Sequence, residues 1–407
     1  MAFWSSLFGR KERKYDSLDL FREIYGGRST RTGVTINWQS ALEVSTVLAC
    51  MQVISQGIAQ VPWKLYDGSN SKPATAHPLY RLLYRKPNRW QTSFEFRETI
   101  AFHAALTGNA YIFVGRVGSD REIRELVPLE PQFMTVERRA GGALLYKYSP
   151  TNGQVAEFDQ SSIWHLKGAS WNAWLGMDAV KLVREAVGLA VATESAHAEM
   201  HKGGARISGL YSVDGKMSKE QYEFLAKWLE QYAMGGERAG RPMILDNGAK
   251  FTPEQMTGVD AQHLETRKFQ IEEICRGFRV MPIMIGYSDK AATYASAEQM
   301  FIAHVVHCLS PWYERIEQSA DTSLLTEEEQ RKGLYTKFNP NALMRGAAKD
   351  RAEFYQRAVG SVNASPGWMT RDEIRALEEL PEMGGDAAEL FAPQPAAAPP
   401  PPDKPAQ

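Results

Sequence analysis

The first long segment of the chain has the apolar spacing of a helix followed by a strand. In INWQSALEVSTVLACMQVISQGIAQVPWKLYDG, apolar residues recur at steps of three and four, so they form one stripe of an amphipathic helix. Pro62 ends this helix because proline lacks a backbone N–H, and WKLY follows as a strand. The stripe comprises Val44, Val47, Leu48, Met51, Ile54, Ile58 and Val61.

The following segments repeat this order and then become rich in strands. TSFEFRETIAFHAALTGNAYIFVGR predicts a helix from Ser93 that ends at Gly108 and Asn109, followed by the strand AYIFV. From residue 123 to 167, the turn signals RAGG and PTNG separate QFMTVERR, ALLYKYS and SSIWHLKG, which are typical of strands. The chain has no βαβ alternation and no glycine fingerprint of a nucleotide-binding sheet. These patterns predict an α+β fold with a mixed α/β body.

Two long helices bracket a small module in the middle of the chain. MDAVKLVREAVGLAVATESAHAEMHKGGA predicts a helix that ends at Gly203 and Gly204, and DAQHLETRKFQIEEICRGF predicts the second. On the second helix, Glu272 and Arg276 have the i,i+4 spacing of a stabilising pair. Its apolar face carries Leu264, Ile271, Ile274 or Cys275, and Phe278. The intervening RISGLYSV, SKEQYEFLAKWLEQYAM and RPMILD predict strand, helix and strand, so we expect an antiparallel helix pair with a small α/β module at its tip.

The segment GYSDKAATYASAEQMF has neither strand alternation nor an apolar face.

The helical pattern SAEQMFIAHVVHCLSPWYERIEQSADTSLL follows, and Pro311 predicts a kink within it. Residues 346–380 predict a helical end piece, in which Thr370 and Glu373 form the capping box of the last helix. The tail APQPAAAPPPPDKPAQ cannot bury a core, so we expect it to be disordered.

Composition narrows the classes of function. The 407 residues include 47 Lys and Arg against 48 Asp and Glu, and the formal net charge of −1 gives no sign of tight, sequence-independent binding to nucleic acid. Cys50, Cys275 and Cys308 are far apart without a CxxC motif, which disfavours a disulfide framework or zinc ribbon and favours a reducing compartment. The initial MAFWSSLFGRKERK has the reverse order of a signal peptide, and its apolar run is too short to span a bilayer.

Patterns of catalytic and metal-binding residues are mostly missing. No GxxxxGK[ST] motif is present, so we do not expect ATP-driven work by this chain alone. His197 and His201 lie one helical turn apart, but Ala198 stands where the HExxH motif has glutamate, and His304 and His307 lack an obvious third ligand. Both pairs are more simply explained as surface or interface histidines. We therefore expect no catalytic residue, no metal site and no cofactor.

Two other classes of function remain as alternatives. A metal-dependent enzyme that processes nucleic acid would use His197 and His201. A membrane-associated assembly scaffold would use FWSSLFGRKERK, a segment that is otherwise an arm docking on a neighbouring subunit.

Nine segments, in their order and spacing, identify a family that none of them identifies alone. They are ALEVSTVLACMQVISQGIAQVPWKLY, HPLYRLLYRKPNRWQTSFEFRE, LTGNAYIFVGR, ELVPLEP, HKGGARISGLYSV, IEEICRGFRVMPIMIG, SAEQMF, LSPWYERIE and TRDEIRALEELPEMGGD. From about residue 34 to residue 386, the chain resembles HK97-type portal proteins of tailed bacteriophages and phage-like particles. One departure is at Ala295 and Ser296, within TYASAE, where the family commonly has an asparagine.

The resemblance implies a ring, usually of twelve identical subunits, at one vertex of the capsid. Double-stranded DNA would be packaged, retained and later ejected through this ring, which would have no enzymatic activity. The large terminase and later the head-tail adaptor would dock on it, the major capsid protein would surround it, and no membrane would be involved. The protein would belong to the virion and pass through the host cytoplasm during assembly.

The resemblance also implies a portal-protein fold with a mixed α/β wing, an antiparallel helical stem, a small α/β clip, a long kinked spine helix and a helical crown. The implied parts are an N-terminal arm (1–33), the first part of the wing (34–176), stem helix 1 (177–204), the clip (205–257), stem helix 2 (258–281), a tunnel-loop region (282–296), the wing's spine helix and return strand GLYTKF (297–345), the crown (346–390) and a disordered tail (391–407).

Two sets of residues are the candidate functional residues under this resemblance. The tunnel loop would face the DNA with Tyr287, Ser288, Lys290, Thr293, Tyr294 and Ser296. The stem would contact neighbouring subunits or line the channel with Glu265, Lys268, Glu272 and Arg276. A channel of this kind must surround DNA without holding it, because each lysine or arginine that neutralises a phosphate adds affinity that opposes sliding. The balanced charge of the chain is compatible with that requirement.

Overall fold

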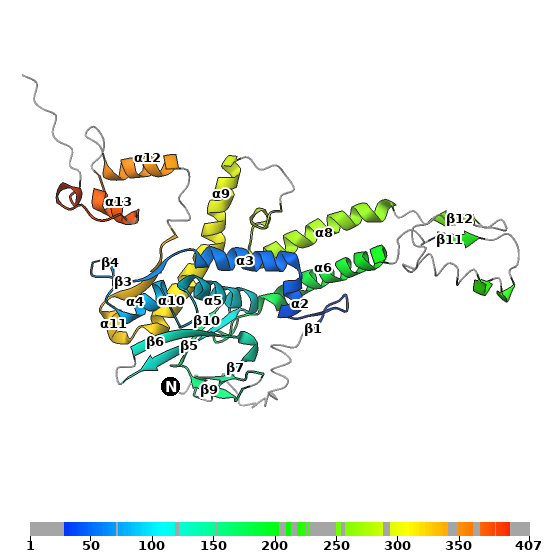
Figure 1. The fold of residues 1–407 in the computed structure, drawn as a ribbon, viewed down its shortest axis with the longest axis horizontal. Coiled ribbons are helices and arrows are strands. Elements are labelled where there is room, and N and C mark those ends of the chain that lie inside the picture. The colour runs from blue at the N-terminus through cyan, green and yellow to red at the C-terminus, as the bar shows by residue number, and fades with distance from the viewer. Residues whose placement is uncertain are drawn as a thin grey trace, which may run out of the picture. The chain divides into compact units, whose positions relative to one another are not determined.

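The computed structural model consists of two compact units, Met1–Phe338 and Asn339–Gln407. It describes residues 28–70, 72–118, 122–139, 141–151, 153–202, 209–212, 218–220, 222–224, 227, 250–253, 257–287, 294–340, 348–360, 367–378 and 380–390. Both units combine helices with irregular connections, and the described strands with a ladder partner lie in the first unit (Figure 1).

Helices from the first third of the chain form one layer of the first unit. They are α2 (Trp38–Glu43), α3 (Ser45–Ala59), α4 (Pro78–Tyr84) and α5 (Ser93–Thr107), and α3 packs against α5 (Figure 1). The predicted apolar stripe is buried except for Leu48, which is 38% exposed, so its inclusion was wrong. The expected single helix is also broken at Val44, whose extended backbone separates α2 from α3. Asn37 and Ser40 form a capping box that starts α2 independently.

Three antiparallel sheets of three strands each complete the body of this unit. The strands of the first sheet lie in the order β13 (Leu334–Phe338), β3 (Trp63–Asp67) and β4 (Lys72–Pro73). Those of the second sheet lie in the order β10 (Ile163–Lys167), β5 (Asn109–Val117) and β6 (Glu122–Leu129). Those of the third sheet lie in the order β7 (Met134–Arg138), β8 (Leu144–Tyr148) and β9 (Ala156–Asp159). A short pair, β1 (Arg28–Ser29) and β2 (Thr35–Ile36), precedes them. The strands predicted in WKLY, AYIFV, QFMTVERR, ALLYKYS and SSIWHLKG are confirmed as β3, β5, β7, β8 and β10. The strands β1, β2, β4, β6 and β9 were not predicted individually, and AEFD of β9 has only one large apolar residue.

The return strand predicted in GLYTKF is confirmed as β13, which pairs with β3 so that Phe338 lies opposite Trp63. The two rings stack with centroids 5.3 Å apart and planes 2° apart. Trp164 of β10 packs beside Trp63 at 5.8 Å, and all three side chains are almost completely buried. Residues distant in sequence therefore share one aromatic cluster, which joins the first and second sheets.

The helix α10 (Ser310–Leu324) covers this cluster and holds β13 through its carboxylates. The backbone N–H of Phe338 donates to Oε1 of Glu317 at 2.6 Å, and that of Thr336 donates to Oδ1 of Asp321 at 2.8 Å. Burial raises the pKa of Glu317 to about 7, although the Phe338 hydrogen bond acts in the opposite direction. A carboxyl group that resists ionisation thus links α10 to the last strand of the body.

The two predicted long helices are confirmed as α6 (Ala179–Lys202) and α8 (Thr257–Phe278), which lie side by side (Figure 1). Of the module predicted between them, the structure describes the strand pair β11 (Gly209–Ser212) and β12 (Lys250–Pro253). The strand expected in RPMILD and most of the helix expected after Ser218 lie outside the described residues.

The long helix that contains Pro311 is divided into three parts. They are α9 (Tyr294–His304), a π-helical turn η3 (Val305–Leu309) and α10. Proline has no N–H to donate, and its ring clashes with the carbonyl four residues earlier, which here is the carbonyl of His307 inside the π turn. The predicted disturbance of the helix at Pro311 therefore takes the form of a π turn immediately before it.

The second unit contains α12 (Ala348–Val359), α13 (Arg371–Leu377) and a short 3₁₀ turn, η5 (Gly385–Ala387). The capping box predicted at Thr370 and Glu373 is confirmed, because each side chain bonds the backbone N–H of the other. The Asp372 carboxylate accepts the N–H groups of Met383 and Gly384 at 2.8 and 2.9 Å, and these bonds lower its pKa. The carboxylate thus ties the chain after α13 back to this helix.

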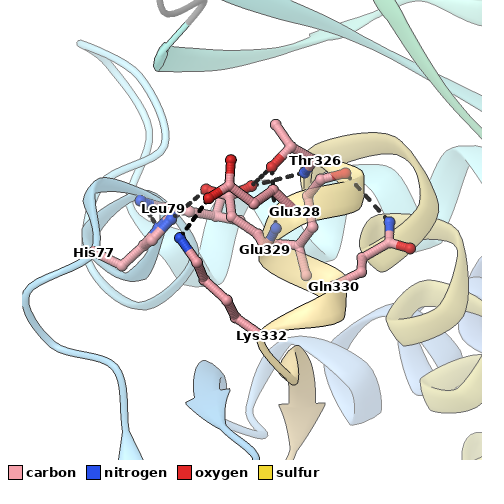
Figure 2. A network of polar contacts seen from close by, with 8 residues as sticks. His77, Leu79, Thr326, Glu328, Glu329, Gln330 and Lys332 are labelled. Carbon is pink, nitrogen blue, oxygen red and sulfur yellow. Dashed lines mark hydrogen bonds and ion pairs between the residues drawn. The ribbon is translucent and has the colours of Figure 1, made fainter.

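A polar network joins α4 to the helix α11 (Glu327–Arg331) on the first unit (Figure 2). His77 accepts the N–H of Leu79 at Nδ1, so its proton is on Nε2 and is donated to Oε1 of Glu329 at 2.7 Å. The other oxygen of Glu329 accepts the N–H and hydroxyl of Thr326, the capping residue of α11. Burial raises the pKa of Glu329, but the hydrogen bonds from Thr326 and His77 outweigh this effect and lower it. One carboxylate therefore caps α11 and fixes α4 against it.

Replacement of Phe338 with alanine tests the aromatic cluster. Phe338→Ala should lower the free energy of unfolding by about 3–5 kcal/mol, because it removes a buried ring and leaves a cavity. Phe94→Ala is the matched control, since the Phe94 side chain is 41% exposed, and should cost less than about 1.5 kcal/mol. Urea unfolding monitored by tryptophan fluorescence would measure both values, and equal losses would contradict the central role of the cluster.

A pH series tests the buried carboxyl group of Glu317. Because folding raises its pKa from 4.5 to about 7, the stability that its protonated form contributes is present below about pH 4.5 and is lost as the pH rises through about 7. Glu317→Gln keeps an oxygen for the Phe338 N–H without an ionisable proton. Relative to wild type, this variant should therefore become more stable as the pH rises from about 5 to about 8. Urea unfolding at each pH, with exposed Glu43→Gln as control, measures this difference; a pH-independent offset would contradict the assignment.

Candidate functional site

The base of the α6–α8 hairpin is fixed by a close backbone contact. Gly108 ends α5 in the left-handed region with φ 75°, and a Cβ there would lie 2.0 Å from the carbonyl oxygen of Met177. Asn109 follows, and its side chain bonds both the N–H and the carbonyl of Gly176, at 2.8 and 3.1 Å. Asp178 then caps α6 by accepting the N–H of Lys181, while burial raises the pKa of Asp178. These contacts set where α6 starts and how it leaves the body.

The contacts between α6 and α8, which form the seam of the hairpin, confirm the predicted antiparallel pairing. Val183 lies against Gly277 near the base, and a Cβ on that glycine would be 2.1 Å from the valine side chain. Further along, Gln270 bonds Thr193 at 3.3 Å, and Arg267 pairs with Glu194 at 3.1 Å. Residue numbers rise on one helix as they fall on the other, so the helices run in opposite directions. The apolar face predicted for α8 is also confirmed at Ile274, Cys275 and Phe278, which are buried.

The four predicted stem residues lie on the part of α8 that turns away from this seam. Glu265, Lys268 and Arg276 are exposed, and Glu272 is half-buried. The expected pairing of Glu272 with Arg276 was wrong, because Arg276 forms its ion pair with Glu273 at i,i+3. Both spacings bring side chains together on a helix, so spacing alone did not decide between the two glutamates. The sequence prediction also missed Phe269, which lies among these charges and is 58% exposed.

Two successive left-handed caps lead from α8 to the predicted tunnel loop. The N–H of Val280 bonds the carbonyl of Cys275 at 2.9 Å and that of Arg279 bonds Arg276 at 3.1 Å, the pattern of a Schellman cap. Arg279 has φ 59°, which is uncommon for a residue with a Cβ. The 3₁₀ turn η2 (Pro282–Ile285) follows and ends at Gly286, with φ 80°. The chain thus reaches Tyr287 through backbone that is hydrogen-bonded at both caps.

The residues predicted to form the tunnel loop do not all lie in a loop, and the structure describes only some of them. Tyr287 is half-buried, and Ser288, Lys290 and Thr293 lie outside the described residues. Tyr294 and Ser296 were expected in the loop, but their backbone belongs to the first turn of α9. Helix formation begins there because the alanines of TYASAEQ favour a helix, so α9 starts two residues before the helical pattern predicted from Ser296.

The three cysteines, distant in sequence, meet where α8 packs on α3. The sulfur atoms of Cys50 and Cys275 are 3.9 Å apart, and Cys308 is near enough to contribute to the raised pKa of Cys50. All three are free thiols and buried. The hydrogen bond with Cys275, together with burial, raises the pKa of Cys50. Burial raises the pKa of Cys308 to about 11, so both thiols are protonated at neutral pH. The cysteines therefore serve as core residues under the hairpin.

A cavity of about 370 Å³ lies beside the start of α6, with Trp38, His103, Tyr111 and Asp178 in its wall. Burial lowers the pKa of His103 to about 4, so its imidazole is neutral at physiological pH. Asp178 already caps α6. The arrangement does not pair a nucleophile with a base and gives no geometry for acid–base chemistry.

No group of three or more potential metal ligands occurs among the described residues. His304 was expected at a surface or interface, but it is only 3% exposed, and burial lowers its pKa. His307 is exposed, so these two histidines do not share one surface. The side chains of His197 and His201 lie outside the described residues. Within the same described part of the chain, no helix has the length and apolar character needed to cross a bilayer.

Comparison with known proteins identifies a family. The model of the family described as "Phage portal protein" matches residues 45–379. The portal protein of Enterobacteria phage HK97 is 30% identical over 360 residues, which cover 87% of this chain and 83% of that protein.

Solved structures show the same fold. A chain from the neck of a native gene transfer agent particle with C12 symmetry has a TM-score of 0.58 and 24% identity, covering 85% of this chain and 92% of that one. An HK97-family phage portal protein from Corynebacterium diphtheriae has a TM-score of 0.56 and 15% identity, covering 79% and 98%. The family model spans most of the chain and the HK97 relative matches over most of both sequences, so the chain belongs to the phage portal protein family.

Proposed function

We propose that this protein forms the ring-shaped channel at the unique vertex of a capsid, through which double-stranded DNA is packaged, retained and ejected. The match to the portal family across residues 45–379 is the observation that carries this proposal. The fold shared with a particle neck of C12 symmetry supports a ring, and twelve subunits is the number that this symmetry favours. The ring acts as a channel and docking platform and has no catalytic activity.

The elements divide naturally among the parts of a portal subunit. Residues 34–176 and 297–345 form the wing, a division supported by the pairing of β3 with β13. The antiparallel helices α6 and α8 form the stem, and residues 205–257 form the clip. Residues 346–390, which include α12 and α13, form the crown. Residues 1–33 are an arm that contacts a neighbouring subunit, and 391–407 are a tail.

The partners follow from this division. The clip is the docking surface for the large terminase during packaging and for the head-tail adaptor afterwards. The major capsid protein surrounds the wing. The assembled ring is part of the virion, and the free subunits assemble in the host cytoplasm. The stem charges at Glu265, Lys268, Glu272 and Arg276 lie at a subunit contact or along the channel, and their exposure on α8 supports either position.

The DNA-facing surface consists of Tyr287, Ser288, Lys290 and Thr293 together with Tyr294 and Ser296 in the first turn of α9. The two left-handed caps before Tyr287 support this proposal, because they give the loop a fixed starting point next to α3. Lys290 supplies one weak phosphate contact per subunit. A single lysine adds to the salt-dependent affinity for DNA without the strong retention that a basic lining would cause.

Electron microscopy of negatively stained protein, combined with native mass spectrometry, tests the proposed function directly. We expect closed rings with a central hole. A strict monomer over a wide range of concentration, even with capsid or scaffold protein present, would count against a portal.

Substitution of Lys290 tests the DNA-facing surface. Lys290→Glu should leave the rings intact but change the yield of packaged DNA or its retention, because it reverses one charge per subunit around the duplex. Lys290→Arg keeps the charge and should behave like wild type. Lys332→Glu is the charge-matched control at the C-terminal end of α11, where Lys332 is exposed and pairs with Glu328. Packaging and retention measured by nuclease-protected DNA that match wild type in Lys290→Glu would remove this residue from the proposed surface.

A further inference from the structure

Basic residues gather around α4, although the charge of the whole chain is balanced. Between Asp67 and Glu95 the chain carries five lysines and arginines and no acidic residue. Three of them, Arg81, Lys86 and Arg89, are exposed and line a groove of about 660 Å³. None of the three pairs with a carboxylate in the part of the chain that the structure describes, so their charges are available to a partner.

The opposite wall of this groove is the first half of β6, the edge strand of its sheet, against which α4 packs. On this wall Arg124 pairs with Glu122 at 2.9 Å, and Glu125 is half-buried. Four cations and two carboxylates therefore line the groove, which carries a net charge of +2.

The rest of the lining is largely apolar. Leu82 and Ile123 are buried and form the deeper part together with Pro87. Val117 lines the groove as well and is 61% exposed. The groove thus combines an excess of positive charge with apolar surface that a partner can cover.

The loop that carries two of the cations is fixed to β6. The N–H of Leu126 donates to the carbonyl of Pro87 at 2.9 Å, and the side-chain amide of Asn88 donates to the carbonyl of Leu126 at 2.9 Å. The oxygen of the Asn88 side chain accepts the N–H of Gln91 at 2.8 Å. Because these bonds hold the backbone in one conformation, a partner does not have to order the loop when it binds.

The edge of β6 is not suited to pairing with an additional strand. The register between β5 and β6 shifts between Gly115 and Arg116, so Arg124 has no partner on β5. Such a bulge twists an edge strand and hinders the pairing of another strand along it. At Leu126 the edge is already bonded to residues 87 and 88. Recognition in this groove therefore depends on its side chains.

We propose that the groove binds an acidic segment of a protein of the surrounding capsid. Carboxylates of that segment pair with Arg81, Lys86 and Arg89, and an apolar side chain covers the apolar lining. This inference rests on the proposed function, which places residues 34–176 in the wing and the capsid protein around it. Charge complementarity of this kind selects the partner and sets its orientation.

A protein segment fits this groove better than duplex DNA does. The DNA backbone presents phosphates and no apolar side chain, so the apolar lining would stay uncovered. Phosphates would also approach Glu125, which has no ion-pair partner among the residues described. Next to Arg89, Trp90 is 65% exposed, and tryptophan and arginine are the residue types that contribute most at protein–protein contacts.

Binding of a model peptide to purified rings tests the groove. The probe is a short fluorescein-labelled peptide of glutamates with one central leucine, and fluorescence anisotropy gives its dissociation constant. Arg81→Glu combined with Arg89→Glu should raise this constant about tenfold, because two attractive contacts become repulsive. Arg138→Glu with Arg139→Glu is the matched control, since both arginines are exposed and neither lines the groove. This control should bind like wild type.

A second pair of variants tests the apolar lining. Val117 and Val155 are both 61% exposed, but only Val117 lines the groove. Val117→Ser should raise the dissociation constant of the leucine-containing peptide about threefold, because it removes apolar contact. It should not change binding of a peptide with serine in place of leucine. Val155→Ser should leave the binding of both peptides unchanged.

Measurements on the wild-type protein do not depend on the folding of any variant. The dissociation constant of the acidic peptide should rise with salt concentration, because salt screens exposed charges. A peptide with lysine in place of glutamate should not bind. Equal binding of the two peptides would overturn the proposal.

The capsid itself provides the last readout. In cells that assemble particles, the portal content of purified capsids, measured by immunoblot, should fall for Arg81→Glu with Arg89→Glu and not for the Arg138 and Arg139 control. Normal incorporation of the groove variant would overturn the assignment of the groove to a capsid protein.

The other outcomes separate this inference from the proposed function. Equal peptide binding by the groove variant and its control, or stronger competition by a short DNA duplex than by unlabelled peptide, overturns the inference and leaves the portal function in place. Loss of rings in the groove variant alone assigns the groove to a contact between subunits and also overturns it. Failure of the wild-type protein to form rings overturns the portal function itself.

Discussion

The first unit depends on the pairing of β3 with β13 around the Trp63–Phe338 stack. Between these strands the chain forms the other two sheets, the α6–α8 hairpin and the segment that leads to α9. The entropy of closing a loop grows only with the logarithm of its length, by about 0.6 kcal/mol for each doubling, so a long excursion costs little more than a short one. Burying large aromatic rings offsets this cost. The body can therefore support a long insertion without losing its core.

Contacts with the body hold the base of the α6–α8 hairpin. At the base, Gly108 contacts the Met177 backbone, Asn109 bonds Gly176, and Cys275 lies against Cys50 of α3. Further out, the described contacts between α6 and α8 include a hydrogen bond from Gln270 to Thr193 and an exposed ion pair between Arg267 and Glu194, and exposed ion pairs contribute at most about 1 kcal/mol. The body therefore fixes where the hairpin begins.

The sequence predicted features that depend on local chemistry and missed those that depend on packing between distant segments. Helical spacing located α6 and α8, glycine ended α5, and Thr370 with Glu373 specified a capping box, because each signal lies within a few residues. Which side of a helix is covered depends on the rest of the fold, so Leu48 was placed in the core although it is exposed. The meeting of Cys50 with Cys275 has no local signal, since the two helices that carry them are far apart in sequence. At the candidate site, the residue types on α8 were predicted, but Phe269 was overlooked because one aromatic residue among charges resembles an ordinary solvated face.

The exposed apolar side chains of the hairpin bear on its stability. An isolated helix pair in water is marginal, and most helical stability in proteins comes from burying an apolar face. Here the outer faces of α6 and α8 keep Leu182, Leu189 and Phe269 in solvent. Anything that binds the folded hairpin and not the unfolded chain stabilises it by mass action. A partner that covers these side chains therefore stabilises the hairpin, because it buries apolar surface that the subunit leaves in solvent.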